Sequence, residues 1–167
     1  HGMAYVDMTL KMMSQFGLDV ICDNKNGSYI ISEGSAYKAL EYDIEPDVSA
    51  ACYFYAMSPL LGVRSQVRGV HRKSLQGDVA FLDVLVDMGC ALSDEKEGII
   101  CIPPHNGHMH GGRWNLSAFS DQALTLAAIA PFAKEPVEID GISHIRLQEC
   151  DRINAILVNL RAMGAKV

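Results

Sequence analysis

The sequence 141-GISHIRLQECDRINAILVNLRAMG-164 decides how the rest of the chain is interpreted. It begins as a turn and continues with apolar residues at three- and four-residue steps, which predicts one long packed helix. The apolar stripe consists of Leu147, Cys150, Ile153, Ile156, Leu157, Leu160 and Met163. Gly164 follows the last apolar residue, where it suits a left-handed helix cap.

The first turns of this predicted helix are polar. Glu149 and Arg152 are three residues apart, so a helix would place them on one face. A carboxylate beside a guanidinium can transfer protons and bind an anion. A solvated helix end with a weak surface ion pair explains the same spacing. The residues alone leave both interpretations open.

The same pattern occurs 72 residues earlier in the chain. The recurring dipeptides are Gly69-Val70 and Leu75-Gln76, matched by Gly141-Ile142 and Leu147-Gln148. Pro59 and Pro131, which end two helix-like runs, have the same separation. Three predicted helix ends also match, at Gly17, Gly89 and Gly164, with separations of 72 and 75 residues. A fixed period of this length indicates a repeat architecture.

The repeated unit is clearest in its middle copy. Apolar spacing there predicts, in order, a helix at 47–61, a strand at 65–70, a helix at 77–88 and strands at 90–93 and 98–102. The third copy predicts a strand near 114–116, a helix at 120–133, a strand at 136–140 and then the helix described first. Residues 5–43 hold only the second helix and last strands of another copy. We therefore expect an α/β protein with one complete unit and two partial ones.

Partial units leave strand edges and apolar faces uncovered. We therefore expect a piece of a longer protein, or a chain that must find a partner. The segment Tyr42–Asp47 is acidic and places a proline just before a predicted helix cap at Asp47. It is the candidate hinge, so the expected domains are residues 1–44 and residues 45–167.

Composition excludes several classes of protein. Apolar residues make up 49% of the chain, which is typical of a globular protein. The sequence has no membrane-spanning run and no secretory signal pattern. Its five cysteines lack CxxC spacing, which favours reduced thiols in a cytoplasmic protein. The net charge of −6 argues against a nucleic-acid partner.

Asp121 is the second candidate for chemistry. Ser120 suits an N-cap, and Asp121 would lie in the first turn of an almost wholly apolar helix, where the helix dipole favours its ionised form. A plain capping role explains the same position. If the two helices of the third unit pack side by side, Asp121 and Glu149 could converge near Arg152. Such a group would suit proton transfer on a phosphorylated substrate.

Two further patterns have simpler explanations. The loop that contains His105, His108 and His110 could bind a transition metal, but it is rich in glycine and lacks a nearby carboxylate, which favours a mobile surface loop. The basic residues between Arg64 and Lys73 could line an anion site, although a solvated face is the simpler interpretation. We predict no metal site.

Several segments resemble the 5-enolpyruvylshikimate-3-phosphate synthase family, and they follow one another in the order found in that family. The run LQECDRINAILVNLRAMGA resembles its Lys-Glu-Ser-Asp-Arg segment. The other matching segments are YVDMTLKMMSQFGLDV, EPDVSAACYFYA, SLQGDVAFLDVLVDMG and FSDQALTLAAIAPFA. The resemblance implies the enolpyruvyl transferase fold, with two lobes that are each built from three βαβαββ units. It also implies transfer of the enolpyruvyl group of phosphoenolpyruvate to the 5-hydroxyl of shikimate 3-phosphate, with release of phosphate and no cofactor.

The resemblance also implies roles for particular residues. Asp121 matches the aspartate that contacts the shikimate hydroxyls and accepts a proton. Glu149 matches the glutamate assigned to proton transfer at the phosphoenolpyruvate methylene, and Arg152 matches an arginine that binds phosphoenolpyruvate. Tyr5 and His144 match positions beside the shikimate moiety. Gln148 replaces a usual lysine at the substrate site, which we expect to weaken binding of an anion.

The resemblance covers only part of the family's length. Several family segments that bind phosphate and phosphoenolpyruvate have no counterpart here, so we expect the chain to be inactive alone. The alternative is a non-catalytic binding or assembly module that reuses the fold. Self-association, or recovery of activity on association with the missing part of the enzyme, would discriminate between the two hypotheses. A metal-binding module based on the histidine loop is a third, weaker alternative.

Overall fold

The computed structural model describes residues 3–23 and 25–167. Their contacts divide the chain between Ile44 and Glu45 into two compact units. We call them the N-terminal unit and the C-terminal unit. The boundary falls inside the candidate hinge at 42–47. That the two units belong to two lobes of a larger enzyme stays a prediction.

The N-terminal unit consists of one helix and one hairpin. Its elements are α1 (Met3–Gln15), β1 (Val20–Asp23) and β2 (Ser28–Ile31), and the two strands pair antiparallel. Gly17 turns the chain after α1 with a positive φ of 80°, which favours glycine. An open apolar hollow of about 350 Å³ lies between the helix and the hairpin. Every described residue of α1 keeps some exposure to solvent.

The middle repeat opens the C-terminal unit. Its helices are α2 (Val48–Leu61) and α3 (Phe81–Asp87), the latter extended at its start by the 3₁₀ turn η1 (Gly77–Ala80). Its strands are β3 (Ser65–Gln66), β4 (Ala91–Glu95) and β5 (Gly98–Ile102). They form an antiparallel sheet with β5 in the centre. The Tyr55 hydroxyl donates to the Ile99 carbonyl at 3.0 Å and so ties α2 to this sheet.

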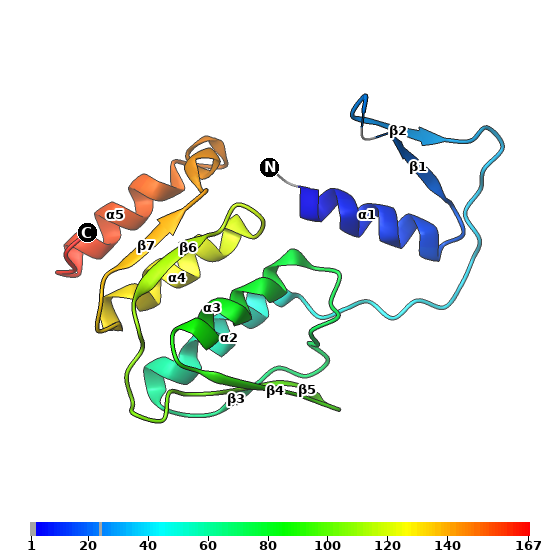
Figure 1. Cartoon of the computed structure of the whole chain (residues 1–167). Coiled ribbons are helices and arrows are strands. Elements are labelled where there is room, and N and C mark those ends of the chain that lie inside the picture. Colours follow the sequence, from blue (N-terminus) through cyan, green and yellow to red (C-terminus); the bar gives the residue numbers. More distant parts are fainter. Residues whose placement is uncertain (1–2, 24) are drawn as a thin grey trace. The chain divides into compact units, whose positions relative to one another are not determined.

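The third repeat has the same order of helix, strand and helix as the middle repeat, but it begins with a strand that has no counterpart there among the described residues. Its strands β6 (Gly112–Asn115) and β7 (Val137–Asp140) pair in parallel. The connection between them runs through η2 (Ser120–Gln122), α4 (Ala123–Ile129) and η3 (Ala130–Phe132). After β7 come the 3₁₀ turn η4 (Ser143–Leu147) and α5 (Arg152–Ala162). Figure 1 shows α4 and α5 beside the β6–β7 pair.

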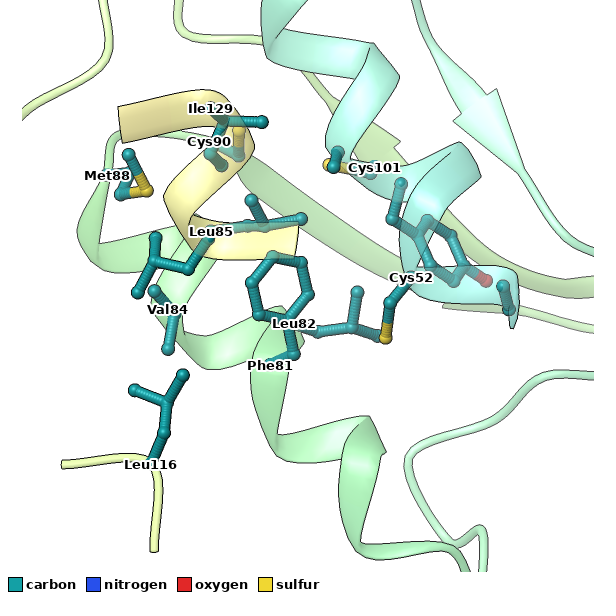
Figure 2. Packing of buried hydrophobic residues seen from close by; sticks show 14 of the residues in the cluster. Cys52, Phe81, Leu82, Val84, Leu85, Met88, Cys90, Cys101, Leu116 and Ile129 are labelled. Carbon is teal, nitrogen blue, oxygen red and sulfur yellow. The ribbon is translucent and has the colours of Figure 1, made fainter. Parts of the chain in front are cut away.

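One hydrophobic core joins the two repeats of the C-terminal unit. Side chains of α3, among them Phe81 and Leu85, lie between Cys52 of α2 and Ile129 of α4 (Figure 2). α4 buries most of its residues, as its almost wholly apolar sequence predicts. Because both repeats contribute to one core, the start of α4 is held rigidly relative to α2 and α3. That start carries Asp121.

The structure corrects the prediction of one long helix from the turn at Gly141. The helix begins only at Arg152, and Asp151 caps it by accepting the Asn154 amide at 2.9 Å. Leu147 and Cys150 fit the helical period, but nothing in the fold covers them, and Leu147 is 89% exposed. Residues 148–150 form a bent connector between η4 and α5. Glu149 therefore precedes the helix and does not share a helix face with Arg152.

Other predicted elements are confirmed with shifted bounds. The predicted helices at 47–61, 77–88 and 120–133 are present, the last two with 3₁₀ turns at their ends. The predicted strand at 65–70 shortens to β3, because the chain turns at Gly69, whose φ is 77°. Residues 32–47 contain no strand, so the middle repeat lacks a first strand among the described residues. No helix within the described ranges has the length and apolarity needed to cross a membrane.

Candidate active site

Arg152 joins two carboxylates at the start of α5. Its Nη1 lies 2.6 Å from Asp121 Oδ1, and its Nη2 lies 2.6 Å from Glu149 Oε2. Its Nε also donates to Glu149 Oε2 at 3.1 Å. Asp121 comes from η2 before α4, and Glu149 comes from the connector before α5. The structure therefore brings together the three residues that the sequence placed at the starts of two helices.

The three side chains differ in their access to solvent. The side chain of Arg152 is 19% exposed, that of Asp121 36% and that of Glu149 76%. The backbone amide of Glu149 and then the Arg152 guanidinium lower the pKa of the Glu149 carboxyl. Burial lowers the pKa of Arg152, but the bonds from Asp121 and Glu149 outweigh that effect and raise it overall. The arginine is a cation held between two anions, and Glu149 is the more exposed of the two carboxylates.

His144 lies on the Asp121 side of this group. It comes from η4, and its Nε2 is 2.9 Å from the Ser120 hydroxyl. Ser120 immediately precedes Asp121, so the contact ties η4 to the start of η2. The histidine is half-buried there. This position is compatible with a role beside a substrate that contacts Asp121.

The two remaining predicted residues are Gln148 and Tyr5. Gln148 is exposed in the connector, next to Glu149 in sequence. Tyr5 belongs to α1 of the N-terminal unit, where it is 54% exposed and lines the apolar hollow. It is described only within that unit.

Sequence reasoning missed an ion pair beside the site. Arg146 Nη1 lies 2.8 and 3.1 Å from the two oxygens of Asp151. The same Asp151 carboxylate caps α5. Both residues were visible as polar positions in the opening stretch. Their pairing depends on the connector between η4 and α5, which the helical period concealed.

A buried polar network behind Asp121 was missed as well. The Ser49 hydroxyl donates to the Asp78 carboxylate, and Gln122 donates to the Ser49 carbonyl at 3.5 Å. The Thr125 hydroxyl in turn donates to Gln122 Oε1 at 2.9 Å. Burial raises the pKa of Asp78, the Ser49 hydroxyl opposes the rise, and the charge of Asp121 adds to it. The network links the starts of α2, α3 and α4.

The other candidate sites have structural explanations. Within residues 3–23 and 25–167, no group of three or more His, Cys, Asp or Glu side chains could hold a metal ion. The basic cluster is largely neutralised by acidic neighbours. Asp94 lies 2.6 Å from His71 Nδ1 and accepts the Arg72 amide, and Arg72 also pairs with Asp83 at 2.5 Å. These contacts favour the interpretation of the basic cluster as a solvated face.

Comparison with known proteins identifies the family to which the chain belongs. The family described as EPSP synthase (3-phosphoshikimate 1-carboxyvinyltransferase) matches residues 2–167. The chain belongs to the EPSP synthase family. A 3-phosphoshikimate 1-carboxyvinyltransferase of Nostoc punctiforme is 38% identical to it over 99% of the chain, and one of Methanospirillum hungatei is 32% identical over 99%. The chain spans only 38% and 39% of the lengths of these two relatives.

A solved structure shows the same fold. The EPSP synthase of Acinetobacter baumannii superimposes with a TM-score of 0.72 over 90% of this chain and 36% of that protein. The sequence identity is 20%, so this likeness concerns the fold alone. It confirms the α/β architecture of repeated units that the sequence predicted.

Proposed function

We propose that this chain supplies part of the catalytic site of a 3-phosphoshikimate 1-carboxyvinyltransferase. The observation that carries the proposal is the bridging of Asp121 and Glu149 by Arg152. The reaction moves the enolpyruvyl group of phosphoenolpyruvate to the 5-hydroxyl of shikimate 3-phosphate and releases phosphate. The reaction needs a group that binds an anion and groups that transfer protons, and these three side chains supply both.

Each of the three groups has a role that fits its surroundings. Asp121 is the less exposed carboxylate and lies beside Ser120 and His144, so we assign it to the hydroxyl that loses a proton. Glu149 is the more exposed carboxylate, and we assign it to proton transfer at the methylene carbon. Arg152 binds an anionic group of phosphoenolpyruvate, for which its planar fork is suited.

An anion that takes the Nε–Nη2 edge of Arg152 would change this arrangement. That edge is engaged by Glu149 and Nη1 by Asp121, so such an anion displaces Glu149. Glu149 is the carboxylate that moves at lower cost, because its side chain is largely in water and its connector is exposed. Displacement would remove the Arg152 contact, which lowers the pKa of Glu149 in addition to the larger effect of its backbone amide. Glu149 would then hold a proton more readily when the substrate is present.

We propose further that catalysis requires the segments of the enzyme outside these 167 residues. The relatives are more than twice as long as the chain, and Gln148 stands where the family usually has a lysine. An exposed apolar face of α2 supports packing against such a segment. It consists of Tyr53, Phe54, Met57 and Leu61.

A chimera tests the proposed function. The chain replaces the matching segment of the Nostoc punctiforme relative, and phosphate release from phosphoenolpyruvate plus shikimate 3-phosphate is measured. We expect turnover by the chimera, no turnover by the 167-residue chain alone, and loss of turnover in the chimera carrying Glu149→Gln. A folded chimera in which Glu149→Gln and Asp121→Asn both keep full turnover would contradict the assignment. Turnover by the chain alone would contradict the need for further segments.

A further inference from the structure

The connector that carries Glu149 is an addition to the repeat. Leu75 and Leu147 are 72 residues apart, but the first helical residues after them, Gly77 and Arg152, are 75 residues apart. The third repeat therefore has three extra residues at this point, and the chain between η4 and α5 uses them as the bend at 148–150. Glu149 lies in the middle of this insertion.

Packing does little to hold the insertion in place. Residues 147–150 are all exposed, and the apolar side chain of Leu147 lies in solvent. The nearest buried anchor on the N-terminal side is Ile145, which is fully buried in the core. On the other side, the first fixed point is Asp151 at the cap of α5. A short segment with so little burial samples many conformations unless its ends are fixed.

One side-chain contact fixes those ends. Arg146 precedes the exposed residues and Asp151 follows them, and their side chains meet through Nη1 at 2.8 and 3.1 Å. The Asp151 carboxylate also accepts the Asn154 amide, so the arginine is fastened to the first turn of α5. We propose that the pair Arg146–Asp151 is a positioning device that closes the connector and keeps Glu149 beside Arg152.

The device explains how an exposed carboxylate can hold a defined place. Glu149 contacts Arg152 at 2.6 Å although its side chain is 76% exposed. An exposed ion pair by itself contributes little to order. The Arg146 and Asp151 side chains are less exposed, at 46% and 39%, and the Asp151 carboxylate is also held by the helix cap. The closed connector lowers the entropy that Glu149 loses when it pairs with Arg152. A catalytic consequence rests on the proposed function, whereas the positioning itself can be measured without any substrate.

The decisive experiment is a titration of the Glu149 carboxyl by ¹³C NMR in the 167-residue chain. Its signal is assigned with Glu149→Gln. The test variant is Asp151→Asn, because asparagine keeps the helix cap but loses the ionic partner of Arg146. Loss of a negative charge acting through space would lower the pKa of Glu149. Loss of positioning separates Glu149 from Arg152 and raises it. The direction of the shift therefore distinguishes the two effects.

We expect the pKa of Glu149 to rise toward its ordinary value in Asp151→Asn and also in Arg146→Gln, with partial recovery in Arg146→Lys. Amide hydrogen exchange at 148–150 should become about fivefold faster, because the connector opens more often when the pair that closes it is lost. The matched control is Arg72→Gln, which breaks the Arg72–Asp83 pair elsewhere in the unit and should change neither quantity. A lowered or unchanged pKa in Asp151→Asn, or unchanged exchange in both test variants, would overturn the proposal.

Failure here is distinct from failure of the proposed function. If the chimera releases phosphate but the pKa of Glu149 is unchanged in Asp151→Asn, the proposed function is retained and the positioning device is rejected. If the pKa of Glu149 rises in Asp151→Asn but the folded chimera releases no phosphate, the positioning device is retained and the proposed function is rejected. In an active chimera, Arg146→Gln should lower kcat more than it raises KM, because the arginine acts through Glu149. If Arg146→Gln lowers the free energy of unfolding of the chimera but leaves kcat unchanged, the pair has only a structural role.

Discussion

The starts of α3 and α5 occupy the same place in two repeats, yet they differ in burial. In the middle repeat, Gln76 accepts the Val48 amide at 2.8 Å and donates to the Pro46 carbonyl at 2.7 Å, and the buried Asp78 follows. In the third repeat, the residue that matches Gln76 at the 72-residue period is the exposed Gln148. The insertion then carries Glu149 out to solvent. One copy of the position holds the fold together, and the other is exposed to solvent.

Of the substitutions compared between the two repeats, those of two leucines should differ most in their effect on stability. Leu85→Ala, in α3, removes a fully buried side chain and should lower the free energy of unfolding by about 2–5 kcal/mol. Leu147→Ala, beside the connector, should change it by less than about 0.5 kcal/mol. Urea unfolding of the 167-residue chain measures both values. Equal losses would show that the connector is packed in solution.

The two glutamines give a smaller but more direct comparison. Gln76→Ala leaves the half-buried Val48 amide and Pro46 carbonyl without their partner, so the free energy of unfolding should fall by about 1–3 kcal/mol. Gln148→Ala should leave it unchanged within error, because that side chain is in water. The same unfolding experiment checks both. If Gln148→Ala lowered the free energy of unfolding as much as Gln76→Ala does, the two positions would not differ in the way described.

The two helix starts should also respond to pH in opposite directions. Burial raises the pKa of Asp78, so the folded state binds its proton more tightly, and the stabilisation by that proton is lost as the pH rises through its raised value. The Asn154 amide first, and then Arg146, lower the pKa of Asp151, so its contribution is lost as the pH falls from the unfolded value near 4 through the lower folded value. Asp78→Asn should thus gain stability at neutral pH relative to acid, and Asp151→Asn should flatten the loss of stability in acid. Unfolding curves at about pH 3 and 7 measure both trends, and parallel pH profiles for the two variants would contradict this assignment.

The sequence predicted the parts of the fold in which apolar spacing and burial coincide. α2 and α4 are regular helices whose apolar residues reach the core, and their positions were predictable. The start of α5 was not, because Leu147 and Cys150 continue the helical period without any surface to pack against. The difference between the 72- and 75-residue separations was the available signal for the connector.

The candidate site shows the same division. Asp121, Glu149 and Arg152 could be selected from their types and their places at helix starts. The Arg146–Asp151 pair and the network through Asp78 could not, because each depends on segments that only the folded chain brings together. Local patterns identified the residues suited to chemistry, whereas the residues that hold them in place depend on tertiary contacts.

The most direct test of the account compares turnover with stability in the chimera carrying Arg152→Gln. The guanidinium is the group that joins both carboxylates, yet it lies at the surface end of α5 and not in the core. We predict that phosphate release falls by about a hundredfold to ten-thousandfold, while the free energy of unfolding changes by less than about 1 kcal/mol. Phosphate release within about threefold of the parent chimera, in a folded variant, would contradict the claim that the third repeat supplies the chemistry.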